Sequence, residues 1–228
     1  MSPRKNMRIT YFGPDLDDYL FDVWMQLIFE AQNALGLYVK IRRAALLRAI
    51  GRSVSGRDYT WLKKAMYAFL RARFVIQVSD EDGISRLVIG KDRPLYLVSH
   101  FAFDDKAESY TFMIDPRWKL IFGDSDYSLI DWNKRMDIRP GHVLARALQR
   151  IFASSSDIDQ KHELEKLKCR LNYRSPKCKF EKSLKLAILE LKRTGIIKDG
   201  DLGTLKNGKE CLKIVRNKAK SAVDISRV

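Results

Sequence analysis

In the first third of the chain, apolar residues recur every three or four positions, the spacing of helices that pack on a core. This spacing predicts helices over residues 17–36, 44–50 and 55–73. Ser55 stands three positions before Asp58, which is a weak form of the capping box that begins many helices. We therefore expect three consecutive helices in this part of the chain.

The pattern then changes to short runs rich in β-branched and aromatic residues, separated by acidic turns. Such runs are typical of strands in an antiparallel sheet. They predict strands over residues 74–78, 86–89, 95–103 and 110–114. The three helices would therefore be followed by an antiparallel sheet.

Helical spacing returns in the second half of the chain, over residues 140–153, 159–169 and 175–194. For the last of these we expect Ser175 to be the N-cap, with Pro176 in the first turn. The positions expected to face the core on this helix are Phe180, Leu184, Ala187, Ile188 and Leu191.

A hairpin is predicted after the last helix. Residues 196–198 begin one strand and residues 212–215 end another, and Asn207 and Gly208 supply turn chemistry between them. Three helices followed by a hairpin therefore occur twice, an order typical of the winged-helix variant of the helix-turn-helix. The predicted fold class is α+β, with two tandem winged-helix domains, the first carrying an enlarged antiparallel sheet.

The expected domain organisation follows from these elements and from the polar stretch after residue 123. We predict a flexible lead-in over residues 1–14, a first winged-helix domain over 15–123, a linker over 124–137, a second winged-helix domain over 138–216 and a flexible basic tail over 217–228.

Charge separates the two halves. The chain has 43 Lys and Arg against 28 Asp and Glu, a net charge of +15. Residues 1–137 carry 21 basic and 18 acidic residues, whereas residues 138–228 carry 22 and 10. A globular half this basic favours a polyanion as partner, and double-stranded DNA suits the predicted fold.

The candidate DNA-binding residues lie around the third helix of each unit. Lysines in a first helical turn oppose the helix dipole, so they make better sense if an anion is expected there. In the second unit the candidates are Arg174, Ser175, Lys177, Lys179, Lys182 and Lys185. In the first unit they are Arg57, Trp61, Lys64 and Arg71, although Trp61 also suits a core position.

No catalytic or metal site emerges from the residues. The glycines between residues 195 and 208 lack the P-loop order, and the three histidines are scattered without zinc-ligand partners. The acidic runs at residues 80–82 and 124–126 read better as solvated turns than as Mg²⁺ ligands. We expect a binding protein with no cofactor, and not an enzyme.

Several segments resemble the TrfA-type plasmid replication initiators. They are YLFDVWMQLI (residues 19–28), ALLRAIGR (45–52), GRDYTWL (56–62), LIFG (120–123) and YSLIDW (127–132). The resemblance implies a two-winged-helix initiator that binds repeated sites, called iterons, at a plasmid origin. It also implies help in opening the adjacent duplex, recruitment of host replication proteins such as the host initiator and helicase, and a homodimer formed through the first domain.

The resemblance raises one further partner, the polymerase sliding clamp. Family members use a short glutamine-leucine motif for it, and the nearest match here is at residues 26–29, inside the first predicted helix. With no apolar run of roughly 18 residues and no secretory signal, we expect no membrane association and a cytoplasmic protein. The resemblance implies that it is a plasmid-associated protein of a bacterium. The alternative function is a transcriptional regulator with the same tandem design and no role in duplex opening. A more distant rival, an RNA-binding protein, lacks an RNP-type aromatic motif and a G-x-x-G loop.

Overall fold

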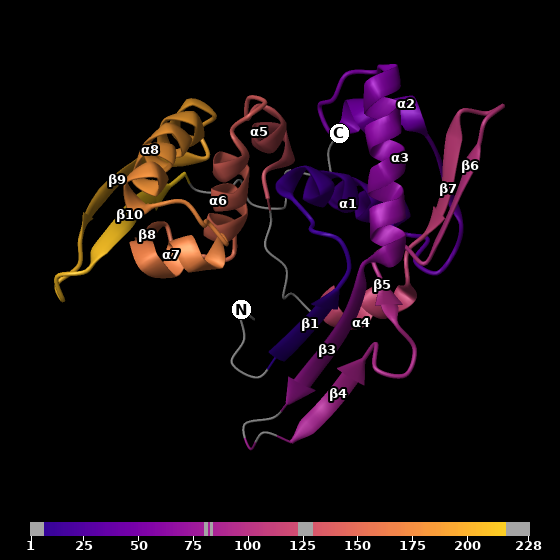
Figure 1. Cartoon of the computed structure of the whole chain (residues 1–228), viewed down its shortest axis with the longest axis horizontal. Helices are drawn as coiled ribbons and strands as arrows, with labels where there is room; N and C mark the ends of the chain where they lie inside the picture. The colour runs from indigo at the N-terminus through magenta and orange to yellow at the C-terminus, as the bar shows by residue number, and fades with distance from the viewer. Residues whose placement is uncertain (1–6, 80–81, 83, 123–129, 218–228) are drawn as a thin grey trace. The chain divides into compact units, whose positions relative to one another are not determined.

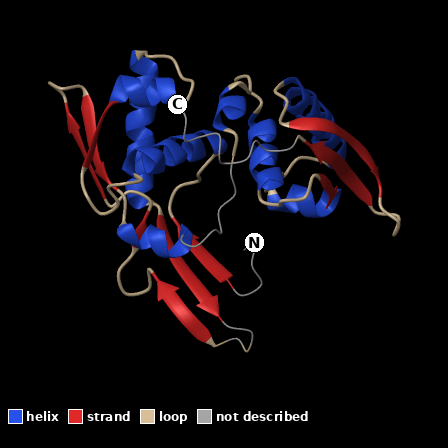
Figure 2. Cartoon of the chain, turned by 180° about the vertical axis from the view of Figure 1, so that it is seen from behind, coloured by secondary structure: helices blue, strands red, loops and turns tan. Residues whose placement is uncertain are grey.

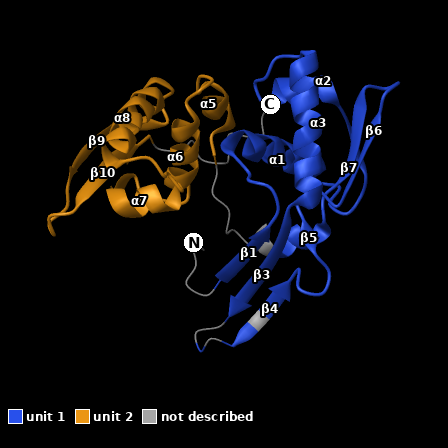
Figure 3. Cartoon of the chain, viewed as in Figure 1, with its two compact units in different colours: residues 1–126 blue, residues 127–228 orange. Residues whose placement is uncertain are grey.

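The computed structural model describes residues 7–79, 82, 84–122 and 130–217. The chain divides into two compact units, residues 1–126 and 127–228 (Figure 3). Both units mix α-helices with antiparallel sheets (Figure 2). No helix in the described ranges is long and apolar enough to cross a membrane.

The first unit contains, in chain order, β1 (Met7–Phe12), α1 (Asp18–Ala31), β2 (Val39–Arg42), α2 (Arg43–Ala49), α3 (Gly56–Arg71), β3 (Arg73–Ser79), β4 (Ser85–Ile89), β5 (Leu95–Tyr96), β6 (His100–Asp104), β7 (Ser109–Met113), a 3-10 turn (Pro116–Trp118) and α4 (Lys119–Phe122) (Figure 1). The core of its helices is made by side chains that are fully buried: Val23, Leu27, Leu46, Leu47, Leu62 and Met66. The predicted cap of α3 is confirmed, because the backbone N–H of Asp58 donates to the Ser55 hydroxyl over 3.2 Å.

The strands of the first unit form two sheets. One has the order β1–β3–β4, with β5 also paired to β3, and the other has the order β2–β7–β6. The single strand predicted over residues 95–103 is therefore wrong. Leu97 and Val98 are both buried, which a strand with one solvated face does not allow for two successive residues. The chain crosses from one sheet to the other at this point.

The predicted lead-in is also wrong for residues 7–12. They form β1, which pairs with β3 along its whole length, from Met7 opposite Val78 to Phe12 opposite Arg73. Residues 1–6 lie outside the described part of the chain, as do residues 124–129 of the predicted linker and residues 218–228 of the predicted tail.

The second unit contains α5 (Trp132–Met136), α6 (Val143–Ala153), β8 (Asp159–Glu163), α7 (Leu164–Arg170), α8 (Lys177–Arg193), β9 (Ile197–Thr204) and β10 (Glu210–Arg216). The helix α5 falls inside the predicted linker, which corrects that boundary. The sheet order is β8–β10–β9, and the hairpin between β9 and β10 turns at Gly208, whose φ of 79° suits glycine. This hairpin is the one expected from Asn207 and Gly208.

The helix predicted over residues 159–169 divides into a strand and a shorter helix. Residues 159–163 form β8, which pairs with β10 from Asp159 opposite Val215 to Glu163 opposite Cys211. Its amide side chain at Gln160 donates to the carbonyls of Phe152 and Asp157, both over 2.9 Å. Only the second half of the predicted helix, α7, is helical.

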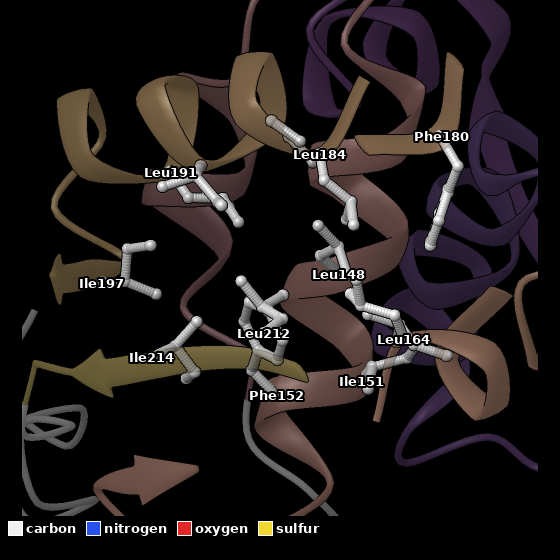
Figure 4. Packing of buried hydrophobic residues seen from close by; sticks show 14 of the residues in the cluster. Leu148, Ile151, Phe152, Leu164, Phe180, Leu184, Leu191, Ile197, Leu212 and Ile214 are labelled. Atoms are coloured by element: carbon white, nitrogen blue, oxygen red, sulfur yellow. The ribbon is translucent and has the colours of Figure 1, made fainter. Parts of the chain in front are cut away.

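The core of the second unit is built around α8. All five side chains predicted to face inward on this helix are buried, from fully buried Leu184 and Leu191 to Ile188 at 5 % exposure. They meet Leu148 and Phe152 of α6 and Leu212 of β10 (Figure 4). The helix predicted over residues 140–153 begins three residues later than expected, at Val143, whose side chain is 39 % exposed.

A buried carboxylate ties the end of α8 to the segment between α5 and α6. The Glu190 side chain is 3 % exposed and accepts hydrogen bonds from the Arg193 guanidinium at 2.6 Å and from the backbone N–H of Arg139 at 2.8 Å. Arg193 also donates to the carbonyl of Asp137. The hydrogen bond from Arg193 is the main reason that the pKa of Glu190 falls to about 2.

This carboxylate gives a stability prediction. Because the folded-state pKa lies below the ordinary 4.5, the contribution of Glu190 is fully present above that pH and is lost as pH falls from about 4.5 to about 2. Replacement of Glu190 by Gln should lower the free energy of unfolding by about 2 kcal/mol at pH 7 and by much less near pH 2. Urea unfolding at the two pH values measures both.

The matched control is Glu181→Gln on the same helix. That carboxylate lies 3.9 Å from Lys177 and is partly exposed, so its loss should change stability by less than about 0.5 kcal/mol. Equal stability of the wild type and Glu190→Gln at pH 7 would show that the buried pair does not hold this end of the helix.

Candidate nucleic-acid interface

The outward face of α8 carries a row of exposed basic side chains. Burial of Phe180, Leu184 and Leu191 fixes the rotation of the helix, so Lys179, Lys182 and Lys185 point to solvent. In the described part of the chain none of these three lysines has a carboxylate within salt-bridge distance. They form an unneutralised cationic arc.

Lys177 differs from these three lysines. Its ammonium group pairs with Glu210 at the start of β10 and lies 3.9 Å from Glu181. The hydrogen bond to Glu210 is the main cause of a raised pKa for Lys177. The sequence predicted that a lysine in the first turn of this helix would bind an anion from outside the chain. Instead, Glu210 of the same chain supplies the anion, and the Lys177–Glu210 pair joins α8 to the hairpin.

The loop before α8 places the other two predicted residues differently. Arg174 is exposed, whereas Ser175 is half-buried. The prediction that Ser175 caps the helix is wrong, because the N-cap is Pro176 and no side chain caps the helix. The free N–H groups of the first turn therefore have no capping side chain.

The hairpin after α8 adds a residue that the sequence reasoning missed. Lys206 is exposed beside Asn207 and Gly208 at the hairpin tip. Its neighbour Lys209 is paired with Glu163 of β8 at 3.1 Å. A lysine next to the Asn-Gly turn was the available signal for this position.

In the first unit, three of the predicted residues lie in one row along α3. Arg57, Lys64 and Arg71 are each seven positions apart and all are exposed. Seven residues make nearly two helical turns, so successive charges are separated by about 10.5 Å along the axis. The guanidinium of Arg71 also donates to the carbonyl of Tyr67 over 3.3 Å.

The fourth predicted residue of the first unit, Trp61, is engaged within the chain. The Arg52 guanidinium lies 3.7 Å from the centre of its ring, and Arg52 also donates to Asp58 over 3.2 Å. Hydrogen bonds from Ser53 and Ser55 lower the pKa of Asp58. The indole is half-buried, and the Arg52 guanidinium lies over its ring.

The residues that the structure describes bring no metal-binding cluster together. They contain no group of three or more His, Cys, Asp and Glu side chains that would hold a metal ion. His162 lies against Phe152, and burial lowers its pKa. Of the cysteines, Cys169 and Cys178 are exposed and Cys211 is buried.

The segment that resembles a clamp-binding motif is part of α1. Leu27 is fully buried and Gln26 is 8 % exposed, with its amide donating to Glu30 over 2.8 Å. Phe29 is the exposed member, at 61 %. The leucine that such a motif would present to a partner is therefore used in the core.

Comparisons with known proteins find solved structures with a similar fold, but they do not assign the chain to a family. No protein-family model and no curated protein matches the chain. A crystal structure of selenomethionine derivatives of domains 2 and 3 of RctB is similar to it with a TM-score of 0.59, at 10 % sequence identity, over 96 % of this chain and 95 % of that chain. A second crystal structure of RctB domains 2-3 gives a TM-score of 0.59 at 13 % identity, over 99 % of this chain and 96 % of that chain. The chain thus shares the two-domain fold of these structures over nearly its whole length.

Proposed function

We propose that this chain is a replication initiator that binds double-stranded DNA at repeated sites in a plasmid origin. The observation that carries the proposal is the unneutralised arc of Lys179, Lys182 and Lys185 on a helix whose other face is the core of its unit. Such an arc supplies unpaired cations that can neutralise phosphates along a groove. The similarity to domains of RctB, a replication initiator, supports the same class.

Each unit is inferred to be a winged-helix domain. In the second unit α8 takes the place of the helix that enters the major groove, and β9 with β10 forms the wing. Arg174 and the uncapped first turn of α8 would add phosphate contacts at one end of the groove. In the first unit α3, with Arg57, Lys64 and Arg71, would bind a separate groove.

The proposed mechanism has no catalytic step of its own. The chain would recognise the repeats, help to open the adjacent duplex and bring in the host initiator and helicase. The chain has no P-loop motif, so ATP-driven unwinding would fall to host proteins.

The first prediction concerns the salt dependence of binding. The probe is a duplex that contains the repeats of the replicon encoding this chain, with a shuffled duplex as control. Replacement of Lys182 by Ala should reduce the slope of log affinity against log salt by about one, because one phosphate contact is lost. Lys177→Ala should change the slope by less than about half of that, because Lys177 is already paired with Glu210 and Glu181.

The two lysines lie on the same helix, so each variant is a control for the other. Fluorescence anisotropy at several salt concentrations gives both slopes. An unchanged slope for Lys182→Ala would remove the outward face of α8 from the interface. Equal wild-type affinity for the repeat and shuffled duplexes would remove the proposal of origin recognition.

The second prediction separates an initiator from a transcriptional regulator. A supercoiled plasmid carrying the repeats and the neighbouring AT-rich segment is treated with permanganate, which oxidises unpaired thymines. An initiator should make thymines in the AT-rich segment reactive, and Lys182→Ala should weaken this effect in step with binding. Full occupancy of the repeats with no reactive thymine would favour the regulator.

The proposed homodimer has a candidate surface in the sheet β1–β3–β4. Directly opposed residues in antiparallel strands share a face, so Ile9, Ile76 and Ile89 lie in one row across the three strands. On the same face Ile9 is 46 % exposed and Leu87 is 39 % exposed. Ile76 and Ile89 are buried within the unit, so the part of this face that is open to a second copy of the chain is its apolar margin at Ile9 and Leu87.

The third prediction tests that surface by sedimentation equilibrium. Replacement of Ile9 by Asp should convert a dimer into a monomer, because a charge at an apolar contact is not solvated. Ile84→Asp is the control, an isoleucine that precedes β4 and is more exposed, at 66 % against 46 % for Ile9. A monomeric wild type would exclude the dimer, whatever its DNA affinity.

A further inference from the structure

The outward face of α8 is not uniformly basic. Leu186 and Leu189 are 60 % and 63 % exposed, although the other leucines of the helix, Leu184 and Leu191, are fully buried. Leu186 follows Lys179 by seven positions, and Leu189 follows Lys182 by seven. Two residues that are seven positions apart lie on nearly the same side of a helix. Leu186 therefore lies about two turns beyond Lys179 on the same side of α8, and Leu189 lies about two turns beyond Lys182.

A partner that fits this face of α8 must carry anionic groups and apolar groups close to each other on its surface. The major groove of DNA has both properties, because phosphates line its edges and the C5-methyl groups of thymine project into it. A membrane surface would need a continuous apolar face on the helix. On α8 that broad face is occupied by the core, through Phe180, Leu184 and Leu191.

We propose that Leu186 and Leu189 read thymine through its C5-methyl group when α8 lies in the major groove. This inference rests on the proposed DNA-binding function and adds a source of sequence choice to it. The lysines of the arc contact phosphates, which are the same in every sequence. The apolar end of the helix supplies the contacts that differ between thymine and the other bases.

The spacing of the leucines predicts where the thymines lie. Three residues advance a helix by about 4.5 Å, and one base pair advances the duplex by about 3.4 Å. The thymines read by Leu186 and Leu189 should therefore be within one or two base pairs of each other.

The test exchanges thymine for deoxyuracil, which differs only by the absence of the methyl group. The probes are the repeat duplex and a copy with deoxyuracil at every thymine. For the wild type the copy should bind more weakly, by about fourfold for each methyl group that a leucine covers. Leu186→Ala and Leu189→Ala should each lose part of this difference and the double variant all of it.

The control variant is Leu120→Ala, which removes an equally exposed leucine, 65 % exposed, from α4 of the first unit. It should retain the full difference between the two duplexes. Replacing one thymine at a time by deoxyuracil then locates the thymines that contribute to affinity. The position that no longer affects the affinity of Leu186→Ala and the position that no longer affects the affinity of Leu189→Ala should be close neighbours.

Three outcomes overturn the inference. Equal wild-type binding to both duplexes excludes methyl contacts, and an undiminished difference in the double variant places them elsewhere in the chain. Loss of binding to phosphatidylglycerol vesicles in the double variant, with unchanged DNA affinity, would assign the leucines to a membrane. The proposed function itself fails separately, if the wild type does not prefer the repeat duplex over the shuffled one.

Discussion

The burial of one face of α8 determines what its other face can do. Phe180, Leu184 and Leu191 pack against α6 and β10, and burial of side chains of this size contributes roughly 1.5–3 kcal/mol each. Rotating the helix by a single residue would expose several of them, so the register of the outward face is set by the core. The Glu190–Arg193 pair fixes the C-terminal end of the same helix. The lysines therefore need no interaction of their own to be held in position.

The sequence predicted the structure well where apolar residues recur at the period of the helix or strand to which they belong. The helices α1, α3 and α8 follow from apolar spacing, and the turn at Gly208 follows from local chemistry. β8 was missed because its side chains are polar and its stability comes from backbone pairing with β10. A strand of that kind is specified by its partner, which lies far along the chain.

The same distinction applies to the candidate site. The exposure of Lys179, Lys182 and Lys185 could be predicted, because it is the complement of the apolar face. The pairing of Lys177 with Glu210 could not, because it depends on where the hairpin returns. Trp61 likewise has a partner, Arg52, that only the packing of the loop before α3 reveals.

These internal partners change how the charge of the second unit should be interpreted. Its basic residues outnumber its acidic ones, but Lys192 pairs with Asp199, Lys209 pairs with Glu163, and Arg216 donates to the carbonyl of Phe152. Such cations hold strands and helix ends together, and they are less available to an external phosphate. Net charge thus indicates the class of partner but overstates the number of contacts. On the outward arc of α8, Lys179, Lys182 and Lys185 have no such partner among the described residues. Leu186 and Leu189 are exposed on the same side of the helix, so the arc and the two leucines belong to one surface.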